Sequence, residues 1–573
     1  MDKIKALCAR LKNAWKKQNF FSLFSLCALM GLLLLTLIVL IKRNDFFDRF
    51  SYELKRPFTW DTTMYYAIGK GMIHGLKPYV DMFETKPPMI FFLAAFSYAL
   101  TKDYYLCNLF SFLCLLLTTL APAVCIGVKL GKKKEKSPLV WALGMLASLS
   151  VGSLLGGYDQ LRSGEVQVEL FGAFFILAYL LLVRTIDVQK TKLYSPKLIS
   201  SALLLMIGVM FKEPFLLIAF AGALLLCKNG KDWLYKFLLP CVYGGVAGVL
   251  LLTITGTLIP YLTAYLPHML VNHISIYGSP FERMKQFDKL LNDMSKYSPL
   301  LLGIVVISIL VAAISILTEK TEKAETPYKN VLFTGTKIAR VLLAPCLISF
   351  AVGLGGQYYN HHYIFALPCY ILCVILLLES IYSIFLTTTT LQAETAQETA
   401  EQENPLLRTF VKLGKACLGV LTVLSLTGIY LLPKPDYAHY DKILAYSVSM
   451  KKDAKYLDEV LDALDEATYQ YFGFNGPIVY AYTEHDPLGP VFFQDPNNLT
   501  DENSFFAENL VAQMDEANVY VVSYIRCGVL NDYVNSYIAE NFTLLQQSEQ
   551  AALVSHIEKP ATFTYKIYVR KGL

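Results

Sequence analysis

The sequence predicts a polytopic α-helical membrane protein with a small extramembrane α/β domain at its C-terminal end. Of its 573 residues, 55% are hydrophobic and only 17% are charged, which is more apolar surface than a soluble chain can bury. Apolar runs recur as far as Leu432, and many approach the roughly 20 residues that a helix needs to cross a bilayer. From Asp436 onward, helix-like and strand-like runs alternate instead.

The N-terminal segment 1–19 is basic, and the first apolar run, Phe20–Ile41, contains no charged residue. The basic segment lacks the small-residue cleavage site of a secretory signal, so we expect it to be a cytoplasmic anchor for the first span. Further runs bring the predicted total to about 11 spans. They lie near residues 105–130, 139–155, 168–183, 199–211, 214–226, 237–259, 300–317, 341–354, 363–386 and 416–432.

Basic residues predict the orientation of these spans. If the N-terminus is cytoplasmic, every cytoplasmic loop is flanked by Lys or Arg, as in Lys132–Lys136, and the odd span count places the C-terminal domain outside. Segment 387–404, rich in Thr, Ala, Gln and Glu, is predicted to be a disordered cytoplasmic loop. The apolar run Met89–Leu100 is too short to cross, so we expect a re-entrant or interfacial helix at the outer face.

A second interfacial helix is predicted at 281–291, where apolar residues recur at helical spacing among charges. It would either cover a site or only seal the bundle. The C-terminal α/β domain is predicted to span 436–573 on the extracytoplasmic side. Its predicted helices are Ser449–Ala467 and Val529–Phe542, and its predicted strands are Gly476–Thr483, Val519–Tyr524 and Thr564–Arg570.

Charge and cysteine usage exclude two classes of function. The net charge is only +5, with no basic array or stacking motif, so nucleic acid is not expected as a partner. The 12 cysteines are scattered, and no CxxC pair occurs. We therefore expect them to fill core or lipid-facing positions rather than to form disulfides or bind metal.

Polar residues gather in the loops predicted to face outward. The first of these loops, 42–104, carries Asp61, Tyr66, Asp81 and the motif Lys86-Pro87-Pro88. Taken alone, Asp61 is an ordinary solvated acid, but charges beside a bilayer indicate that a polar substrate is handled there. The other outer turns add Arg162, Glu165, Glu169, Lys212-Glu213-Pro214, Tyr359, His361 and His362.

The first loop resembles that of the GT-C membrane glycosyltransferases. In particular, it resembles the group that uses polyprenyl-phosphate sugars, which includes the protein O-mannosyltransferases and the lipid A aminoarabinose transferases. In that family an acid shortly after the first span is the catalytic base, and a Lys-Pro-Pro or His-Pro-Pro motif begins the helix that re-enters the membrane; Asp61 and Lys86-Pro87-Pro88 match these two features. Ser163-Gly164-Glu165 resembles the family's second acidic site, although Glu169 competes for that position, and Gly355–Tyr363 resembles its late Gly-x-x-Tyr-x-x-His-Tyr turn.

The resemblance implies the GT-C fold over residues 20–432 and an active site on the extracytoplasmic face of the bacterial cytoplasmic membrane. It also implies inverting transfer of a sugar from a polyprenyl-phosphate donor to a cell-envelope glycan, a lipid or a protein. Asp61 would be the base, and Lys86 would contact the donor phosphate with support from Arg162 or Lys212. Glu165 would orient the sugar, the acceptor or a divalent metal. The further substrate-binding candidates are Tyr66, Asp81, Glu169, Tyr359, His361 and His362.

Plainer interpretations stand beside these roles. Lys86 also suits a lysine that snorkels at a helix start, and Glu213 is positioned in sequence to neutralise Lys212. Two adjacent histidines point apart and the sequence shows no third ligand, so we expect hydrogen bonds from them rather than a metal site. At the level of function, the alternatives are a transporter or flippase of lipid-linked saccharides and a non-catalytic envelope assembly or sensor protein. A transporter would call for charged spans and inverted repeats, which the sequence does not show.

Overall fold

The computed structural model describes residues 60–132, 148, 166–270, 279–297, 306, 309, 310, 313, 316, 327–354, 360–376, 378, 379, 437–464, 467–473, 476–493, 499, 501, 502 and 504–572. The basic segment 1–19, the predicted spans 20–41 and 416–432, and the loop 387–404 lie outside this part of the chain. Most of the predicted spans 139–155 and 300–317 lies outside it as well. So do three candidate site residues, Arg162, Glu165 and Tyr359.

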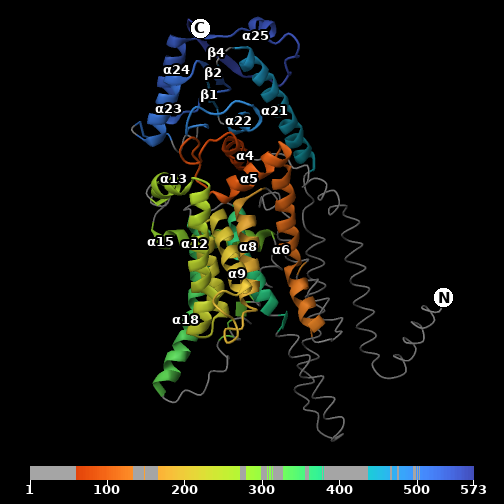
Figure 1. The fold of residues 1–573 in the computed structure, drawn as a ribbon, viewed down its shortest axis with the longest axis vertical. Coiled ribbons are helices and arrows are strands. Elements are labelled where there is room, and N and C mark those ends of the chain that lie inside the picture. Colours follow the sequence, from red (N-terminus) through yellow and green to blue (C-terminus); the bar gives the residue numbers. More distant parts are fainter. Residues whose placement is uncertain are drawn as a thin grey trace, which may run out of the picture.

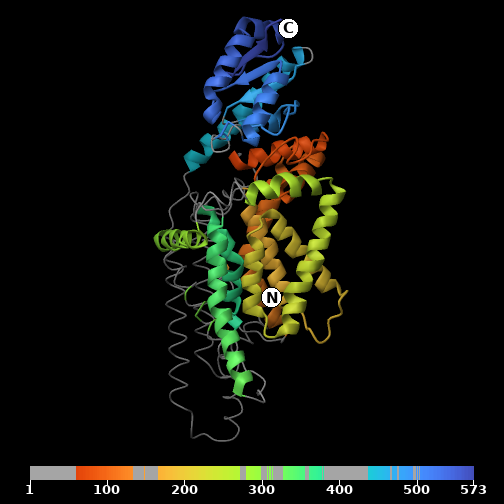
Figure 2. The same cartoon turned by 90° about the vertical axis from the view of Figure 1, so that its left-hand side faces the viewer.

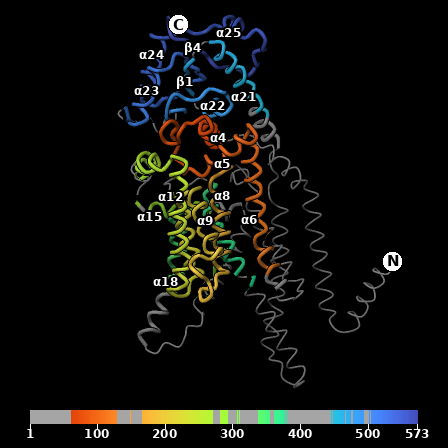
Figure 3. Tube along the Cα trace, viewed as in Figure 1, coloured from red at the N-terminus to blue at the C-terminus, as the bar shows by residue number. Residues whose placement is uncertain are grey.

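The described residues before 380 form a helical body, and the C-terminal region lies at one end of it (Figures 1 and 3). Its longer helices are α4 (Trp60–Ile73), α5 (Met89–Thr101), α6 (Tyr105–Lys132), α8 (Val168–Val183), α9 (Pro196–Phe211), α10 (Phe215–Leu226), α12 (Leu239–Ile254), α16 (Gln286–Tyr297), α18 (Pro327–Gly353) and the helix His361–Leu376. Short helices connect them: α11 (Gly230–Trp233), η2 (Leu234–Leu238), α13 (Leu258–Pro260), η3 (Tyr261–Tyr265), α14 (Leu266–His268), α15 (Pro280–Met284) and η6 (Asn360–Ala366).

Two stretches of this body, Tyr105–Val128 and Gly230–Ile254, are long and apolar enough to cross a membrane. The outward-facing side of α12 is aliphatic, since Val242, Val246 and Ile254 are exposed. Lipid solvates such a surface better than water does. These findings support a helical protein associated with a membrane, although two such stretches fall far short of the 11 spans predicted.

The centre of the body is α8, which is buried on nearly every side by α6, α9, α10 and η6. Glycine allows close helix contact next to it, because a Cβ on Gly244 of α12 would lie 2.8 Å from the carbonyl oxygen of Ala202 on α9. Since α8 is held by so many neighbours, its N-terminal residues are fixed relative to the surrounding helices. This rigidity positions the candidate site described below.

A layer of two helices, α4 and α5, separates this bundle from the C-terminal region (Figure 2). The helices touch closely at Gly69, where a Cβ would come within 2.6 Å of the Cβ of Ala94. Asp61, assigned from the sequence to the loop 42–104, occupies the first turn of a helix, α4, within that segment. An acid is favourable there because it faces the positive end of the helix dipole. The 13-residue α5 is too short to cross a bilayer, in keeping with the short re-entrant or interfacial helix predicted there.

The predicted interfacial helix at 281–291 is present as α15 and α16, which run crosswise to α18 (Figure 2). The guanidinium of Arg283 donates to the carbonyl of Leu354 at 3.2 Å, and Leu290 is buried in the bundle core. These contacts attach the helix to α18. Among the described residues they fit the sealing role considered from the sequence.

The C-terminal region contains a four-stranded sheet in the order β1-β2-β4-β3. The first pair is parallel and the other two are antiparallel, with Tyr469 opposite Val519, Val521 opposite Ile567, and Thr543 opposite Val569. The strands are β1 (Tyr469–Phe472), β2 (Val519–Val522), β3 (Phe542–Leu544) and β4 (Lys566–Arg570). The helices and the 3-10 turn are α21 (Tyr437–Ala463), α22 (Gly476–Tyr482), α23 (Phe505–Glu516), η7 (Gly528–Leu530), α24 (Asn531–Asn541) and α25 (Gln547–Leu553).

The strands predicted near Val519–Tyr524 and Thr564–Arg570 are confirmed as β2 and β4. The strand predicted at Gly476–Thr483 was wrong, since this run forms the helix α22. Ile478, Val479, Tyr480 and Ala481 are all buried, where α22 packs against α4. A short run buried all round has no periodicity that separates a helix from a strand, which explains the error.

Candidate functional site

The N-terminus of α8 reaches the first turn of α4. Gln167, which precedes α8 as its N-cap, donates from Nε2 to Oδ2 of Asp61 at 3.3 Å. Gln167 is buried, whereas Asp61 is half-buried. The sequence reasoning missed Gln167, although its place between two candidate acids, Glu165 and Glu169, at the start of an apolar run was a usable signal. The amide fixes one face of the Asp61 carboxylate and leaves the side chain partly accessible.

Lys86 lies in the loop that leads into α5, backed by a buried carboxylate. Its Nζ is 3.2 Å from Oε1 of Glu84, and the lysine side chain is 19% exposed against 4% for the glutamate. Burial alone would lower the pKa of Lys86, but the negative charges of Glu84, Asp61 and Glu169 outweigh burial and raise this pKa above its ordinary value. Lys86 is therefore a charged ammonium group within electrostatic range of Asp61 and Glu169.

Tyr79 braces this loop from inside the helical body. Its backbone has φ +70°, a left-handed conformation that is rare for an aromatic residue and that the surroundings must hold in place. The Tyr79 ring lies 4.8 Å from that of Tyr265, and its hydroxyl donates to the carbonyl of Lys86 at 2.7 Å. The backbone of Lys86 is thus tied to the bundle, which limits where its ammonium group can lie.

Lys212, which follows α9, pairs with the buried carboxylate of Glu169 on the first turn of α8. The lysine is 20% exposed and the glutamate 1%. The alternative in which Glu213 neutralises Lys212 was wrong, because Glu213 instead accepts a hydrogen bond from the hydroxyl of Tyr265 at 2.6 Å. The physical reason is the extended backbone of Lys212, with φ −163° and ψ +127°, which points neighbouring side chains in different directions.

Two histidines complete the cluster around Glu169. One ligand atom from each of Glu169, His361 and His362 lies within 4.8 Å of the others, and Nε2 of His361 is 3.7 Å from Oε1 of Glu169. Within the described part of the chain, Oε2 of Glu169 is buried without a hydrogen-bond partner. The expectation that these histidines lack a third ligand was therefore wrong. Two imidazoles and one carboxylate with open positions form a donor set that suits a divalent metal such as Zn²⁺.

Acidic residues outnumber lysines at this end of the bundle. In the described residues, the ammonium groups of Lys86 and Lys212 lie among the carboxyl groups of Asp61, Glu84, Glu169 and Glu213, so the acids outnumber the lysines. Buried charge is costly unless it is compensated. A further cation at this place would complete the balance.

Two candidate residues have other roles in the structure. The ring of Tyr66 stacks on that of Tyr104 with 3.9 Å between centroids, and its hydroxyl donates to Asn108 at 3.4 Å, so it packs α4 against α6. Asp81 accepts the backbone N–H of Lys77 at 2.7 Å and stabilises a local turn.

Six of the predicted site residues thus come together from distant parts of the sequence. They are Asp61, Lys86, Glu169, Lys212, His361 and His362. Comparison of the chain with family models, with curated proteins and with solved structures finds no match.

Proposed function

We propose that this chain is a multi-pass membrane glycosyltransferase that moves a sugar from a polyprenyl-phosphate donor to an extracytoplasmic acceptor. The observation that carries the proposal is the convergence of two lysines, two histidines and two carboxylates at one end of an apolar bundle. Of the two carboxylates, that of Asp61 is partly accessible, and that of Glu169 has one oxygen without a hydrogen-bond partner in the described residues. Polar groups gathered at the end of a lipid-facing scaffold suit a substrate with a lipid tail and a charged, hydroxylated head. The resemblance of the first loop to the GT-C family points to the same substrate class.

The lysine pairs support recognition of the donor phosphate. In both pairs the carboxylate is deeply buried and the lysine side chain is partly exposed, so the carboxylate holds the lysine from its inner side. An ammonium group held in this way can donate to phosphate oxygens from its open side. Oε2 of Glu169, which has no partner in the described residues, can accept a hydrogen bond from a sugar hydroxyl.

Asp61 supports the chemical step. Its half-buried carboxylate is held by Gln167 and remains reachable by an acceptor hydroxyl. In the proposed displacement, the acceptor oxygen forms a bond to the anomeric carbon as the bond from that carbon to the phosphate oxygen breaks. Asp61 takes the proton of the acceptor hydroxyl, and the phosphate leaves as the anion. A single displacement inverts the anomeric centre.

The proposed function requires additional positive charge at the site, because acids already outnumber lysines there and the donor phosphate adds negative charge. Arg162, predicted from the sequence as a second phosphate contact, lies outside the described residues and would supply one positive charge. A divalent cation on Glu169, His361 and His362 would supply two. Such a cation would stabilise the departing phosphate, and the three residues would hold it.

The experiment that tests the proposal uses the purified full-length chain in lipid nanodiscs with radiolabelled polyprenyl-phosphate sugars. The expected result is loss of label from the lipid, by transfer or slow hydrolysis, in the wild type and not in Asp61→Asn. Movement of intact lipid-linked saccharide across the bilayer without cleavage would favour a transporter. If the protein neither cleaves nor moves the donor, an assembly or sensor role is favoured.

A further inference from the structure

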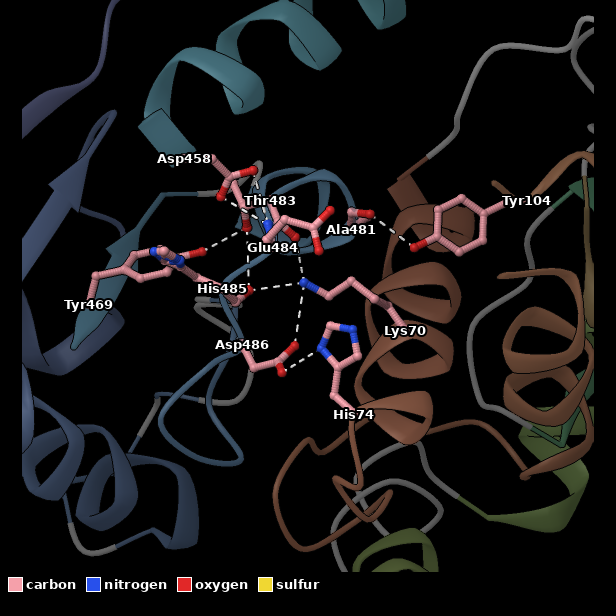
Figure 4. Close-up of polar contacts among 10 residues, drawn as sticks. All are labelled: Lys70, His74, Tyr104, Asp458, Tyr469, Ala481, Thr483, Glu484, His485 and Asp486. Carbon is pink, nitrogen blue, oxygen red and sulfur yellow. Dashed lines mark hydrogen bonds and ion pairs between the residues drawn. The ribbon is translucent and has the colours of Figure 1, made fainter. Parts of the chain in front are cut away.

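Lys70, on the last turn of α4, is the central residue of the contact with the C-terminal region. Its side chain is only 2% exposed. Its Nζ donates to the carbonyl oxygens of Thr483 at 2.6 Å and His485 at 2.9 Å, and it lies 3.3 Å from the carboxylate of Asp486 (Figure 4). These three partners come from one short segment, 483–486, which follows α22. The ammonium group of Lys70 therefore contacts three polar groups of that one segment.

Neighbouring contacts extend this attachment. Nδ1 of His74, in the turn that directly follows α4, lies 2.7 Å from the second carboxylate oxygen of Asp486 (Figure 4). On the other side of the segment, both carboxylate oxygens of Asp458 accept the backbone N–H of Glu484 at 2.9 Å. The segment 483–486 is thus held between α4 and α21, and Lys70 is its most deeply buried charged contact.

The chain that follows segment 483–486 contacts the loop that carries Lys86. The backbone N–H of Phe83 donates to the carbonyl of Pro490 at 3.0 Å, and the ring of Phe83 packs 5.3 Å from that of Phe506. Phe83 directly precedes Glu84, the carboxylate that backs Lys86. A displacement of the C-terminal region would therefore pull on Phe83 and move the Glu84–Lys86 pair.

We propose that Lys70 is a positioning residue that keeps the C-terminal region docked, and that the docked region holds the Glu84–Lys86 pair where it binds the donor phosphate. The second half of this inference rests on the proposed function, while the first half concerns the geometry of the protein alone. The C-terminal region thereby becomes part of the working site although it supplies no reacting group. Lys70 acts through the loop and does not touch the substrate.

The geometric half is tested by amide hydrogen exchange on the full-length chain. Lys70→Met keeps the length of the side chain and removes its donors, so we expect faster exchange at Phe83 and in the loop 77–86, because the bond to Pro490 opens more often. Lys451→Ala is the matched control. It also removes a lysine that joins α21 to the helical body, through Asp103 at 3.2 Å, but that pair is 41% and 46% exposed and should contribute little.

The functional half is tested with the same variants in donor kinetics. We expect Lys70→Met to raise the KM for the donor by about tenfold or more, Lys70→Arg to recover part of the loss, and Lys451→Ala to match the wild type. A folded Lys70→Met whose loop stays protected, or whose loop loosens while donor kinetics stay unchanged, would overturn the proposal. If Lys70→Met does not fold, the milder Asp486→Asn is measured under the same criteria. A wild type without any transfer refutes the proposed function, whereas the exchange result still decides whether Lys70 holds the loop.

Discussion

Lysines are largely buried both at the end of the bundle and at the interface with the C-terminal region, but the number of their polar partners differs between the two places. At the interface, Lys70 is surrounded by two carbonyl oxygens and a carboxylate. At the end of the bundle, Lys86 and Lys212 each pair with one buried carboxylate and keep 19% and 20% of their side chains exposed. A saturated lysine can only join parts of the protein, whereas a lysine with an open side can bind a further ligand.

Electrostatics separate the two places in the same way. Burial lowers the pKa of Lys70, with Asp486 acting against it, while the carboxylates around Lys86 raise the pKa of that lysine. Acidic groups outnumber lysines at both places, because Lys70 lies near Asp458 and Glu484 as well as Asp486. Structural attachment and candidate substrate binding therefore differ in whether groups of the protein already occupy the lysine, and not in the number of charges around it.

The largest expected effect concerns Asp61 and tests whether the end of the bundle is catalytic. Asp61→Asn retains the size of the side chain but cannot take a proton, so turnover should fall by about 10² to 10⁴ while donor binding survives. The measurement is kcat for transfer alongside equilibrium binding of the donor. Asp103→Asn, in the segment between α5 and α6, is the control and should leave kcat unchanged. Wild-type turnover in a folded Asp61→Asn protein would remove the base assignment.

The next effect concerns the open side of Lys86. Lys86→Ala should weaken donor use by roughly tenfold to over a hundredfold, since the loss of a charge-assisted hydrogen bond costs about 1.5 to 3 kcal/mol. Lys77→Ala removes an exposed lysine from the same loop and should behave as wild type. Donor kinetics measured side by side decide between them. Equal donor kinetics for the two variants would indicate that Lys86 only anchors the helix at the membrane surface.

Six residues of the candidate site were predicted from the sequence, but Glu84, Gln167 and the pairing of the charged groups were not. Chemically capable residues beside apolar runs identified Asp61, Lys86 and Glu169, because charge next to a bilayer is costly without a function. The partner of Lys212 was missed, since the direction of adjacent side chains depends on backbone angles that no residue pattern specifies. The role of Gln167 was missed for a related reason, because an uncharged amide carries no signal until its neighbour in space is known.

The fold shows the same division. Strongly patterned elements such as β2 and β4 were predicted, because their apolar residues are bounded by polar turns. The short run that forms α22 was assigned to the wrong class, since it is buried on all sides by α4 and its own domain. The contact of Lys70 with segment 483–486 joins residues more than 400 positions apart, and no local sequence pattern predicts it. Tertiary packing decided each of these cases.

A smaller effect would sharpen the comparison through the possible metal ligands of the candidate site. If a divalent cation on Glu169, His361 and His362 supplies the missing charge, chelation should lower donor use by more than about tenfold, and added Zn²⁺ or Mn²⁺ should restore it. The readout is donor cleavage before and after dialysis against a chelator, together with metal analysis of the wild type and of His361→Ala. Full activity without metal would instead assign the balancing charge to Arg162.

The smallest effect concerns the interface and its dependence on pH. Burial raises the pKa of Asp458, which accepts the N–H of Glu484, to about 7, well above the value of about 4 for an unfolded aspartate. Between these values the folded protein keeps a proton that the unfolded chain has lost, so this group's contribution to stability is complete below pH 4 and disappears as the pH rises through 7. Asp458→Asn should remove that slope.

The measurement is the apparent melting temperature of the full-length chain between pH 5 and pH 8. Relative to Asp458→Asn, the wild type should lose about 2 to 4 °C over this range. His485 acts in the opposite direction, because burial lowers its pKa and its contribution grows as the pH rises, but it is present in both proteins and cancels in the difference. The other charged groups at this contact, Lys70, Asp462, Glu484 and Asp486, are likewise retained in both. Parallel pH profiles for the two proteins would show that Asp458 is solvated like a surface acid and does not contribute to the pH dependence of this interface.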